Sequence, residues 1–336
     1  MKFVIVTDTH LGKKSNDEDN QLTLNLFKTI CSTAEEKGIK KFIHLGDLFH
    51  GRTLSYKTMD YANQIGRMLS NTFEISYICV GNHDVHYKDQ ISPNGISPIF
   101  QPFPNIEVVD TITELDIDDI ALFPWPTSEN IHLLEEAESK VIIGHFGINE
   151  LPMNRFGSYN IKEPLNISDF KDFKLVLSGH YHTPSERSNI KYLGSPYHME
   201  FSDAGNRGYY IFDSEDISLE FIKFDSPKFK IYNVDSDEFT EEEIYGNHIR
   251  LDFPSKKENT EIENLIEKVE NLGALSVKTK FNFQSEFEVK EQEKDISELG
   301  DNKEIMNDYI DNIEVPNGIK KDHLKSVMDN IFEESK

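Results

Sequence analysis

Polar side chains that can bind a metal ion or move a proton follow five short apolar runs in this sequence. They are Asp8 and His10 after the first run, Asp47 after the second, Asn82 and His83 after the third, His145 after the fourth, and His180 and His182 after the fifth. The carboxyl ends of strands border the functional crevice of an α/β sheet. If the runs are strands, these side chains therefore meet at one sheet edge.

The ligand set is mixed, with two carboxylates, one amide and four imidazoles, and it contains no thiolate. Such a set suits Mn²⁺, Mg²⁺, iron or Zn²⁺ and differs from a cysteine-rich structural zinc site. Asp47 lies between the groups and could bridge two ions. Two ions about 3.5–4 Å apart can activate a water and hold both oxygens of a phosphoester displacement. His50, three residues after Asp47, is close enough to support the ligands or contact a phosphate.

Each motif has a simpler interpretation when it is taken alone. Asp8-Thr9-His10 is a common pattern, and the tetrapeptide from Gly81 to Asp84 could be only a tight turn. The conjunction of five such strand ends is what predicts a dinuclear metal centre. We interpret the other histidines as structural or solvated, namely His44, His86, His132, His198, His248 and His323.

The elements that must position these residues begin with three buried strands that alternate with two helices. The strands are expected at Lys2–Val6, 40–45 and 74–80, and the helices at 21–37 and 55–69. This β-α-β-α-β rhythm predicts an α/β layered domain whose sheet is at least partly parallel. Further strands are expected at Ile106–Val109, Ile120–Phe123 and 141–143, with a short helix over 129–140. Four later runs are expected to close a second sheet, at 175–177, 190–193, 208–212 and 217–224.

The character of the chain changes near Pro227. A strand at His248–Phe253, a helix at 260–272 and a strand at 274–283 predict a small β-α-β module. Residues 284–294 are highly charged and poor in core residues, which indicates a linker. Two helices with apolar stripes are expected at about 295–313 and 319–334, because Pro316 and Gly318 break the pattern between them. We therefore expect three parts, with the bounds 1–226, 227–284 and 285–336.

Composition limits the classes of function. The 336 residues carry 35 Lys and Arg against 60 Asp and Glu, for a net charge of −25. This charge by itself argues against nucleic acid, because phosphate binding usually needs a basic surface. We expect no membrane span, since no apolar run approaches about 20 residues. Two cysteines provide no disulfide framework, which fits a reducing cytoplasm.

The motifs together resemble the five signature blocks of the calcineurin-like metallophosphoesterases. The hexapeptide from Leu45 to His50 resembles a block of the SbcD-type DNA double-strand-break nucleases, and the segment from Tyr192 to Pro196 resembles one that follows their last metal block. The length and the C-terminal helix pair are similar in layout to the recombination nuclease subunits of T-even phages. The resemblance covers residues 1–225 in sequence and the remainder only in layout.

The resemblance implies a four-layer α/β/β/α core with a small capping domain that contacts DNA. It implies a DNA exonuclease or endonuclease of recombination, repair or replication that uses two divalent ions. Mn²⁺ is the expected ion, and Mg²⁺ is the alternative. One ion would be held by Asp8, His10, Asp47 and His182, and the other by Asp47, Asn82, His145 and His180. His83 would orient the phosphate or protonate the leaving oxygen, Asp84 would fix the His83 ring, and His50 would contact the scissile region.

The resemblance also implies partners. DNA is the substrate, an SMC-like coiled-coil ATPase would dock on the C-terminal helices, and the chain would form a homodimer. The ATPase could supply much of the DNA-binding surface, which reconciles DNA with the acidic composition, and we expect the isolated chain to bind DNA weakly. Four cations near the first two motifs could contact phosphates or could be ordinary solvated charges, namely Lys13, Lys14, Arg52 and Lys57.

Two alternatives remain open. A calcineurin-like phosphatase or phosphodiesterase acting on small phosphoesters would share the metal centre but would not need residues 227–336. A non-catalytic scaffold is a second alternative, although the intact His83 and ligand set argue against it. The sequence has no phosphate-binding loop of the Gly-X4-Gly-Lys-Ser/Thr type, which argues against a nucleotide-hydrolysing ATPase.

Overall fold

The computed structural model describes residues 1–13, 17–115, 118–151, 163–238 and 240–281, together with Lys321 and Lys325. The chain divides into two compact units, Met1–Phe283 and Gln284–Lys336. The expected linker and C-terminal helix pair lie outside the described residues, except that Lys321 and Lys325 are helical. In the described part of the chain, no helix is both long and apolar enough to cross a membrane.

Six strands form the first sheet, in the spatial order β12-β11-β1-β2-β3-β4. They are β1 (Lys2–Val6), β2 (Lys41–His44), β3 (Ile75–Cys79), β4 (Ile106–Val109), β11 (Gly208–Asp213) and β12 (Ser218–Lys223). Strands β1 to β4 are parallel to one another, whereas β11 pairs antiparallel with both β1 and β12. Parallel neighbours need long crossovers, and two of these are the expected helices.

Helices α1 (Asp17–Lys37) and α2 (Tyr56–Thr72) provide these two crossovers and cover one face of the first sheet. Helix α1 starts four residues before the predicted position, and its first turn is acidic. Acidic side chains are favourable there because the helix dipole is positive at the N-terminus. Helix α2 is capped by Ser55, whose side chain accepts the N–H of Thr58 at 3.1 Å.

The second sheet has the order β5-β6-β7-β8-β10-β9. Its strands are β5 (Thr113–Leu115), β6 (Ile120–Phe123), β7 (Val141–Gly144), β8 (Leu175–Ser178), β9 (Ser185–Arg187) and β10 (Ile190–Tyr192). The helix predicted over 129–140 is a six-residue 3₁₀ helix, η1 (Ile131–Glu136). Two further short helices lie in the two-sheet part of the chain, α3 (Ser97–Phe100) and η2 (Ile167–Phe170).

The prediction that strands near 208–212 and 217–224 close the second sheet was wrong. Strands β11 and β12 extend the first sheet, because Phe3 of β1 pairs with Phe212 of β11. The two strands follow the second sheet directly in sequence, and sequential strands are usually neighbours. The pairing across more than two hundred residues overrides that tendency.

Side chains that alternate along β1 belong to two different apolar clusters, one on each face of the first sheet. Phe3 and Ile5 of β1 belong to the apolar cluster between the two sheets, whereas Val4 and Val6 belong to the cluster under α1 and α2. Successive side chains of a strand point to opposite faces, so both faces of the first sheet are buried. A third cluster covers the outer face of the second sheet and includes Phe146 and Phe170. The order helix, sheet, sheet and short helical turns confirms the layered α/β class.

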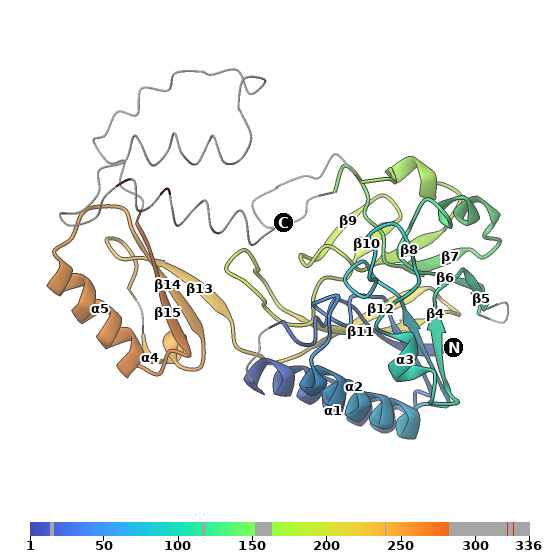
Figure 1. Ribbon diagram of the computed structural model, residues 1–336, viewed down its shortest axis with the longest axis horizontal. Coiled ribbons are helices and arrows are strands. Elements are labelled where there is room, and N and C mark those ends of the chain that lie inside the picture. The colour runs from blue at the N-terminus through green and yellow to red at the C-terminus, as the bar shows by residue number, and fades with distance from the viewer. Residues whose placement is uncertain are drawn as a thin grey trace, which may run out of the picture. The chain divides into compact units, whose positions relative to one another are not determined.

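A third sheet of three parallel strands follows, in the order β13-β14-β15 (Figure 1). Its elements are β13 (Phe229–Asn233), α4 (Glu241–Ile244), β14 (His248–Phe253), α5 (Asn259–Asn271) and β15 (Ser276–Phe281). The predicted β-α-β module is present as β14, α5 and β15, and β13 is an additional strand. Alternate residues of β14, namely Ile249, Leu251 and Phe253, form the core of this sheet together with Val269 of α5.

Candidate metal centre

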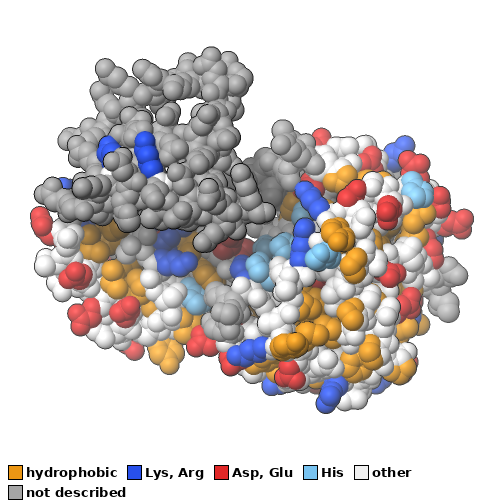
Figure 2. All heavy atoms as spheres, in the orientation of Figure 1, with side chains coloured by type: hydrophobic (Ala, Val, Ile, Leu, Met, Phe, Trp, Pro, Cys, Tyr) orange, Lys and Arg blue, Asp and Glu red, His pale blue; other side chains and the backbone are white. Residues whose placement is uncertain are grey.

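The polar strand ends of both main sheets converge, not those of a single sheet as the sequence indicated. Asp8, Asp47 and Asn82 lie two or three residues after the ends of β1, β2 and β3 in the first sheet. His145 and His180 lie one and two residues after the ends of β7 and β8 in the second sheet. The Asp8 N–H donates to Gly46 O at 3.1 Å, and the Gly179 N–H donates to Gly144 O at 3.0 Å. These bonds hold the strand ends of each sheet side by side. Histidine side chains gather near the centre of the face shown in Figure 2, beside lysine or arginine side chains.

Four of the predicted residues have positive backbone φ angles. The values are 51° for Asp8, 44° for His10, 54° for Asp47 and 88° for His180. This left-handed region is uncommon for residues with a Cβ, and backbone strain of this kind concentrates at functional sites. Each residue lies in the segment that follows a strand, and the ligand atoms of these segments meet in two groups.

Two glycines allow the strand ends to approach closely. A Cβ on Gly81 would lie 2.2 Å from the backbone nitrogen of Asp47, and a Cβ on Gly179 would lie 2.0 Å from Thr7 Oγ1. No side chain fits at such distances. Gly81 is therefore required for the close contact between the ends of β2 and β3.

The predicted ligands form two groups. In the first, Asp8, His10 and His182 bring ligand atoms within 4.8 Å of one another, and the Nε2 atoms of His10 and His182 lie 3.0 Å apart. In the second group, the ligand atoms of Asp47, His145 and His180 also lie within 4.8 Å of one another. Asn82 Oδ1 belongs with the second group, because it lies 3.0 Å from His145 Nε2 and 3.0 Å from His180 Nδ1.

Asp47 joins the two groups through one oxygen. Its Oδ2 lies 3.7 Å from His10 Nε2 and 3.3 Å from His145 Nε2. Its other oxygen, Oδ1, accepts the backbone N–H of His83 at 2.9 Å. The side chain is thus fixed in the orientation that points Oδ2 at both groups, which is the arrangement a bridging carboxylate needs.

Hydrogen bonding and burial prepare the imidazoles to act as ligands. His145 donates its Nδ1–H to Leu45 O at 3.0 Å, which leaves Nε2 to face the site. Although burial alone lowers the pKa of His145, the charge of Asp47 outweighs this effect and raises the pKa to about 9. A metal ion that binds His145 Nε2 must therefore displace a proton. Burial lowers the pKa of His10 well below its usual value, so this ring is neutral. Carboxylate, amide and neutral imidazole donors fit divalent ions.

His83 and His50 lie beside the ligands and are half-buried, so a substrate can reach them. His83 donates its Nδ1–H to the backbone oxygen of His50 at 2.7 Å, which leaves Nε2 pointing away from that bond. The two rings stack with centroids 5.4 Å apart, and His50 Nδ1 lies 3.3 Å from His10 Nδ1. The structure therefore brings both residues to the edge of the first ligand group.

The role expected for Asp84 was wrong. Its carboxylate accepts four backbone N–H groups, from Gly81 at 2.8 Å, Asp47 at 2.9 Å, Phe49 at 2.9 Å and Leu48 at 3.4 Å. Asp84 thus joins the ends of β2 and β3, and the His50 carbonyl orients the His83 ring. Burial and the charge of Asp47 raise the pKa of Asp84 to about 7. A short sequence motif shows that two residues are adjacent, but it does not show which groups their side chains form hydrogen bonds with.

Comparison with known proteins agrees with this geometry. The family model of the calcineurin-like phosphoesterases matches residues 1–184, which is more than half of the chain. The chain belongs to the calcineurin-like phosphoesterase family. It is 33% identical over 232 residues to "Exonuclease subunit 1" of Enterobacteria phage T4, covering 66% of this chain and 67% of that protein. The resemblance drawn from the motifs is confirmed.

Among solved structures, the crystal structure of Pseudomonas putida nuclease MPE matches this phosphoesterase with a TM-score of 0.33 and 15% sequence identity. The match covers 65% of this chain and 87% of that chain. Members of the family are hydrolases that use divalent metal ions, and this phosphoesterase has two groups of histidines and aspartates that could hold them.

The sequence analysis did not single out Arg207, a buried residue that lies after the segment matched by the family model. Arg207 donates to the backbone oxygen of His182 and pairs with Asp203, whose Oδ1 lies 3.0 Å from its NH2. The segment after β10 is tied to the same place, since Ser195 N–H donates to His182 O at 3.0 Å. Nothing in the residues next to Arg207 distinguishes it from an ordinary surface arginine. The resemblance over Tyr192 to Pro196 did draw attention to the nearby segment after β10.

Glu163 and Trp125 are two further residues that the sequence did not single out. Glu163 Oε1 lies 3.7 Å from His180 Nε2, and the Trp125 ring centroid lies 5.1 Å from that of His180. Glu163 lies between the predicted strands at 141–143 and 175–177, where no element was predicted. Trp125 follows β6 directly, so it shares the strand-end position of the ligands, but indole is not a metal-ligating group.

The remaining polar candidates have varied environments. Lys13 Nζ donates to Met199 O at 3.3 Å, Lys57 pairs with Asp17 at 2.7 Å, and Arg52 is exposed. Lys14 lies outside the described residues. The structural role expected for His44 fits its burial, since its ring accepts the Gly46 N–H at 3.2 Å.

Proposed function

We propose that this phosphoesterase is the nuclease subunit of a DNA-processing complex and hydrolyses phosphodiester bonds in recombination, repair or replication. The observation that carries the proposal is the pair of ligand groups joined at Asp47, with the half-buried His83 and His50 beside them. The similarity to a phage exonuclease subunit supports DNA as the substrate.

The ligand groups would hold two divalent ions, for which we propose Mn²⁺, with Mg²⁺ as the second choice. One ion would be held by Asp8, His10, Asp47 and His182, and the other by Asp47, Asn82, His145 and His180. When bound, two such ions activate a water and neutralise the charge of a phosphodiester. The absence of thiolate ligands supports hard or borderline ions.

The chain's own groups then position the substrate and move a proton. With its Nδ1–H committed to the His50 carbonyl, His83 presents Nε2 to the substrate. We propose that this nitrogen binds the phosphate or, when protonated, gives its proton to the leaving oxygen. A positioned acid or base of this kind contributes about 10²–10⁴-fold to a rate. His50 would contact the scissile region from the stacked position, while Asp84 holds the strand ends that carry the ligands.

We propose three functional parts, residues 1–226 for phosphodiester hydrolysis, 227–284 for capping and DNA contact, and 285–336 for a partner. The partner would be an SMC-like coiled-coil ATPase, bound by the apolar stripes of the C-terminal helices, and the assembly would contain two copies of this chain. The net charge of −25 supports a division of labour in which the partner supplies much of the DNA-binding surface.

A nuclease assay tests the catalytic proposal. Linear duplex DNA and Mn²⁺ are given to the wild type and to the variants Asp47→Ala, His83→Ala and His86→Ala. We expect Asp47→Ala to lose both metal binding and nucleotide release, and His83→Ala to keep metal binding but release nucleotides at least about a hundredfold more slowly. His86 is exposed and serves as the matched histidine control. Equal nucleotide release by all four proteins would refute the proposal.

A second experiment tests the partner. A charge placed in the apolar stripe, Leu324→Asp, should abolish co-purification of the ATPase. Ser326→Asp adds the same charge on the opposite side of the expected helix and should leave it intact. Co-purification that survives Leu324→Asp would contradict the expected docking site.

The same purified protein distinguishes the small-molecule alternative. A phosphatase or phosphodiesterase for small phosphoesters would hydrolyse p-nitrophenyl phosphate or its diester and leave duplex DNA intact in the presence of Mn²⁺. We expect cleavage of DNA.

A further inference from the structure

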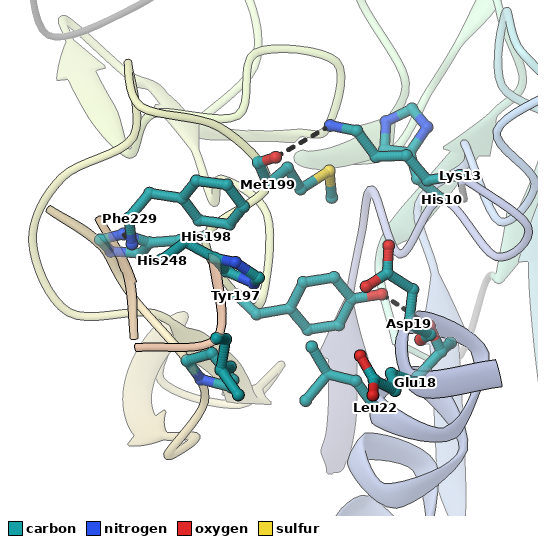
Figure 3. A pocket seen from close by; sticks show the side chains of 13 residues that line it. His10, Lys13, Glu18, Asp19, Leu22, Tyr197, His198, Met199, Phe229 and His248 are labelled. Carbon is teal, nitrogen blue, oxygen red and sulfur yellow. Dashed lines mark hydrogen bonds between the residues drawn. The ribbon is translucent and has the colours of Figure 1, made fainter. Parts of the chain in front are cut away.

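A pocket lies between the N-terminus of α1, the segment after β10 and the first residues of the third sheet. One end of the pocket is formed by His10 of the first ligand group and by Lys13, and the body is lined by Glu18, Tyr197, Phe229 and His248 among others. Figure 3 shows Phe229 on one side, the carboxylates of Glu18 and Asp19 on the other, and the Tyr197 ring between them. The pocket is therefore continuous with the candidate metal centre.

Aromatic rings form one wall and are held in place. The Tyr197 hydroxyl donates to Thr9 O and lies 2.8 Å from Thr23 Oγ1, so the ring is fixed between the β1 end and α1. The Phe229 ring packs against His248, with centroids 4.4 Å apart, and edge-on to Phe201 at 5.1 Å. These rings present a firm surface on which a flat molecule can stack.

His198 fixes the backbone beneath this wall. Its Nε2–H donates to Gly205 O at 3.0 Å, and its Nδ1 accepts the N–H of Phe229 at 3.4 Å. The ring thus connects the segment after β10 to the first residue of β13. Because the His198 ring is hydrogen-bonded to the Phe229 backbone, it helps to fix the position of Phe229 relative to the metal centre.

The charges at the two ends of the pocket differ. Glu18 and Asp19 belong to the acidic first turn of α1, whereas Lys13 and the ligand group lie at the other end. Two carboxylates repel a phosphate, but they accept hydrogen bonds from a neutral group with N–H donors. A cation beside the metal centre attracts a phosphate. This polarity matches a nucleotide whose phosphate lies at the metal centre and whose base enters the pocket.

We propose that the pocket binds one nucleobase of the substrate strand, next to the phosphodiester at the metal centre. The base stacks against Phe229 and Tyr197, and its N–H groups donate to Glu18 or Asp19. The exocyclic amines of adenine, cytosine and guanine each carry two N–H donors, one for each carboxylate, whereas thymine has only its ring N3–H, so the pocket favours the first three. The proposal rests on the proposed nuclease function and adds to it a recognition site that the metal-binding motifs do not contain.

The first test compares intact DNA with DNA that has a single abasic site, moved one nucleotide at a time past the cleaved bond. In the wild type, we expect an abasic site at one position to slow single-turnover cleavage about tenfold, the size of a typical base–aromatic stacking effect. In Phe229→Ala and in Phe229→Leu, which keeps apolar bulk without a ring, this ratio should approach one. Phe221→Ala removes an exposed aromatic ring of β12 outside the pocket lining and should keep the ratio.

The outcomes separate the two proposals. If the wild type does not cleave DNA at all, the proposed function fails. If it cleaves DNA but no position is sensitive to base removal, or if both Phe229 variants keep the wild-type ratio, the pocket proposal is overturned.

A second test addresses the carboxylates. With cytosine or thymine at the sensitive position, the wild type should cleave the cytosine substrate several-fold faster, and Glu18→Gln should reduce that preference. Glu18 is exposed and only lines the pocket, so the variant is expected to fold. Equal rates for cytosine and thymine in the wild type would overturn the assignment of the acidic wall.

Discussion

The candidate metal centre and the three-stranded sheet hold their polar side chains in different ways. At the centre, Asp8, Asp47 and His145 have at most 1% of their surface exposed. Each of these side chains forms a hydrogen bond with a backbone group of another strand end. On the third sheet, Lys278 and Lys280 of β15 are exposed, and they occupy alternate positions on the face opposite the α5 core.

This difference separates groups that must be preorganised from groups that only add charge. Burying a polar group is costly unless it is hydrogen-bonded, so each buried ligand depends on partners from other strands. Exposed lysines pay no such cost and depend on little around them. Substitutions at the centre should therefore have large and coupled effects, and those on the open sheet face should have small and independent ones.

The largest effect is expected for Asp47→Asn. The carboxylate oxygen shared by the two ligand groups becomes part of a neutral amide, so we expect metal content to fall and phosphodiester hydrolysis to slow by about a thousandfold or more. Metal analysis and single-turnover kinetics measure the two effects. Asp252→Asn on β14 is the matched control and should keep the wild-type metal content. Full metal content in Asp47→Asn would break the contrast between the two regions.

Arg207→Met should destabilise the protein by about 3–5 kcal/mol, because it leaves Asp203 buried without its charged partner. Adding Asp203→Asn should restore part of the loss, and urea unfolding of the double-mutant cycle measures the coupling. The exposed pair Lys37 and Glu220, 2.9 Å apart, is the control and should show a coupling below about 1 kcal/mol. Similar coupling in both pairs would contradict the distinction between buried and exposed charges.

Asp84→Ala should cost about 3 kcal/mol of unfolding free energy, because four buried N–H groups lose their acceptor. The unfolding transition should be followed without added metal, so that loss of ions does not contribute. Asp89→Ala removes an exposed carboxylate that accepts from Ser128 and should cost less than about 1 kcal/mol. If the two variants are equally stable, Asp84 does not hold the strand ends.

A pH effect of intermediate size is expected from His44. Burial lowers its pKa from 6.5 to about 3, so between these values the unfolded chain binds a proton that the folded chain does not. Stability should therefore fall as the pH falls below 6.5, by up to about 1.4 kcal/mol per pH unit for this one proton. His44→Gln removes this titration, and its unfolding free energy should change less between pH 7 and pH 5 than that of the wild type. The same change in both proteins would contradict the assignment.

The smallest effect is expected for Lys280→Ala. This exposed residue of β15 should change the unfolding free energy by no more than about 0.5 kcal/mol and leave metal content unchanged. If the face contacts DNA, the salt dependence of DNA binding should weaken by about one counterion. A loss of metal content in Lys280→Ala would show that the two regions are not independent.

The local pattern of the sequence was sufficient for much of the fold and for the members of the candidate site. The strands Ile106–Val109, Ile120–Phe123 and His248–Phe253 were predicted with the bounds that the structure shows. The candidate ligands were found because each is a polar residue directly after an apolar run, and both marks lie within a few residues. Hydrophobic periodicity and strand-end position are local properties, and a single sequence displays them.

Only the tertiary structure decided which strands are neighbours and which partners each polar group chooses. It placed β11 beside β1, brought Arg207 to the His182 carbonyl, and directed Asp84 to four backbone N–H groups instead of the His83 ring. These contacts join residues that are mostly far apart in the chain, and their energy comes from satisfying buried groups that no local pattern reveals. The sequence alone determined the types of the reactive groups, and the stacking of the two sheets determined that they meet.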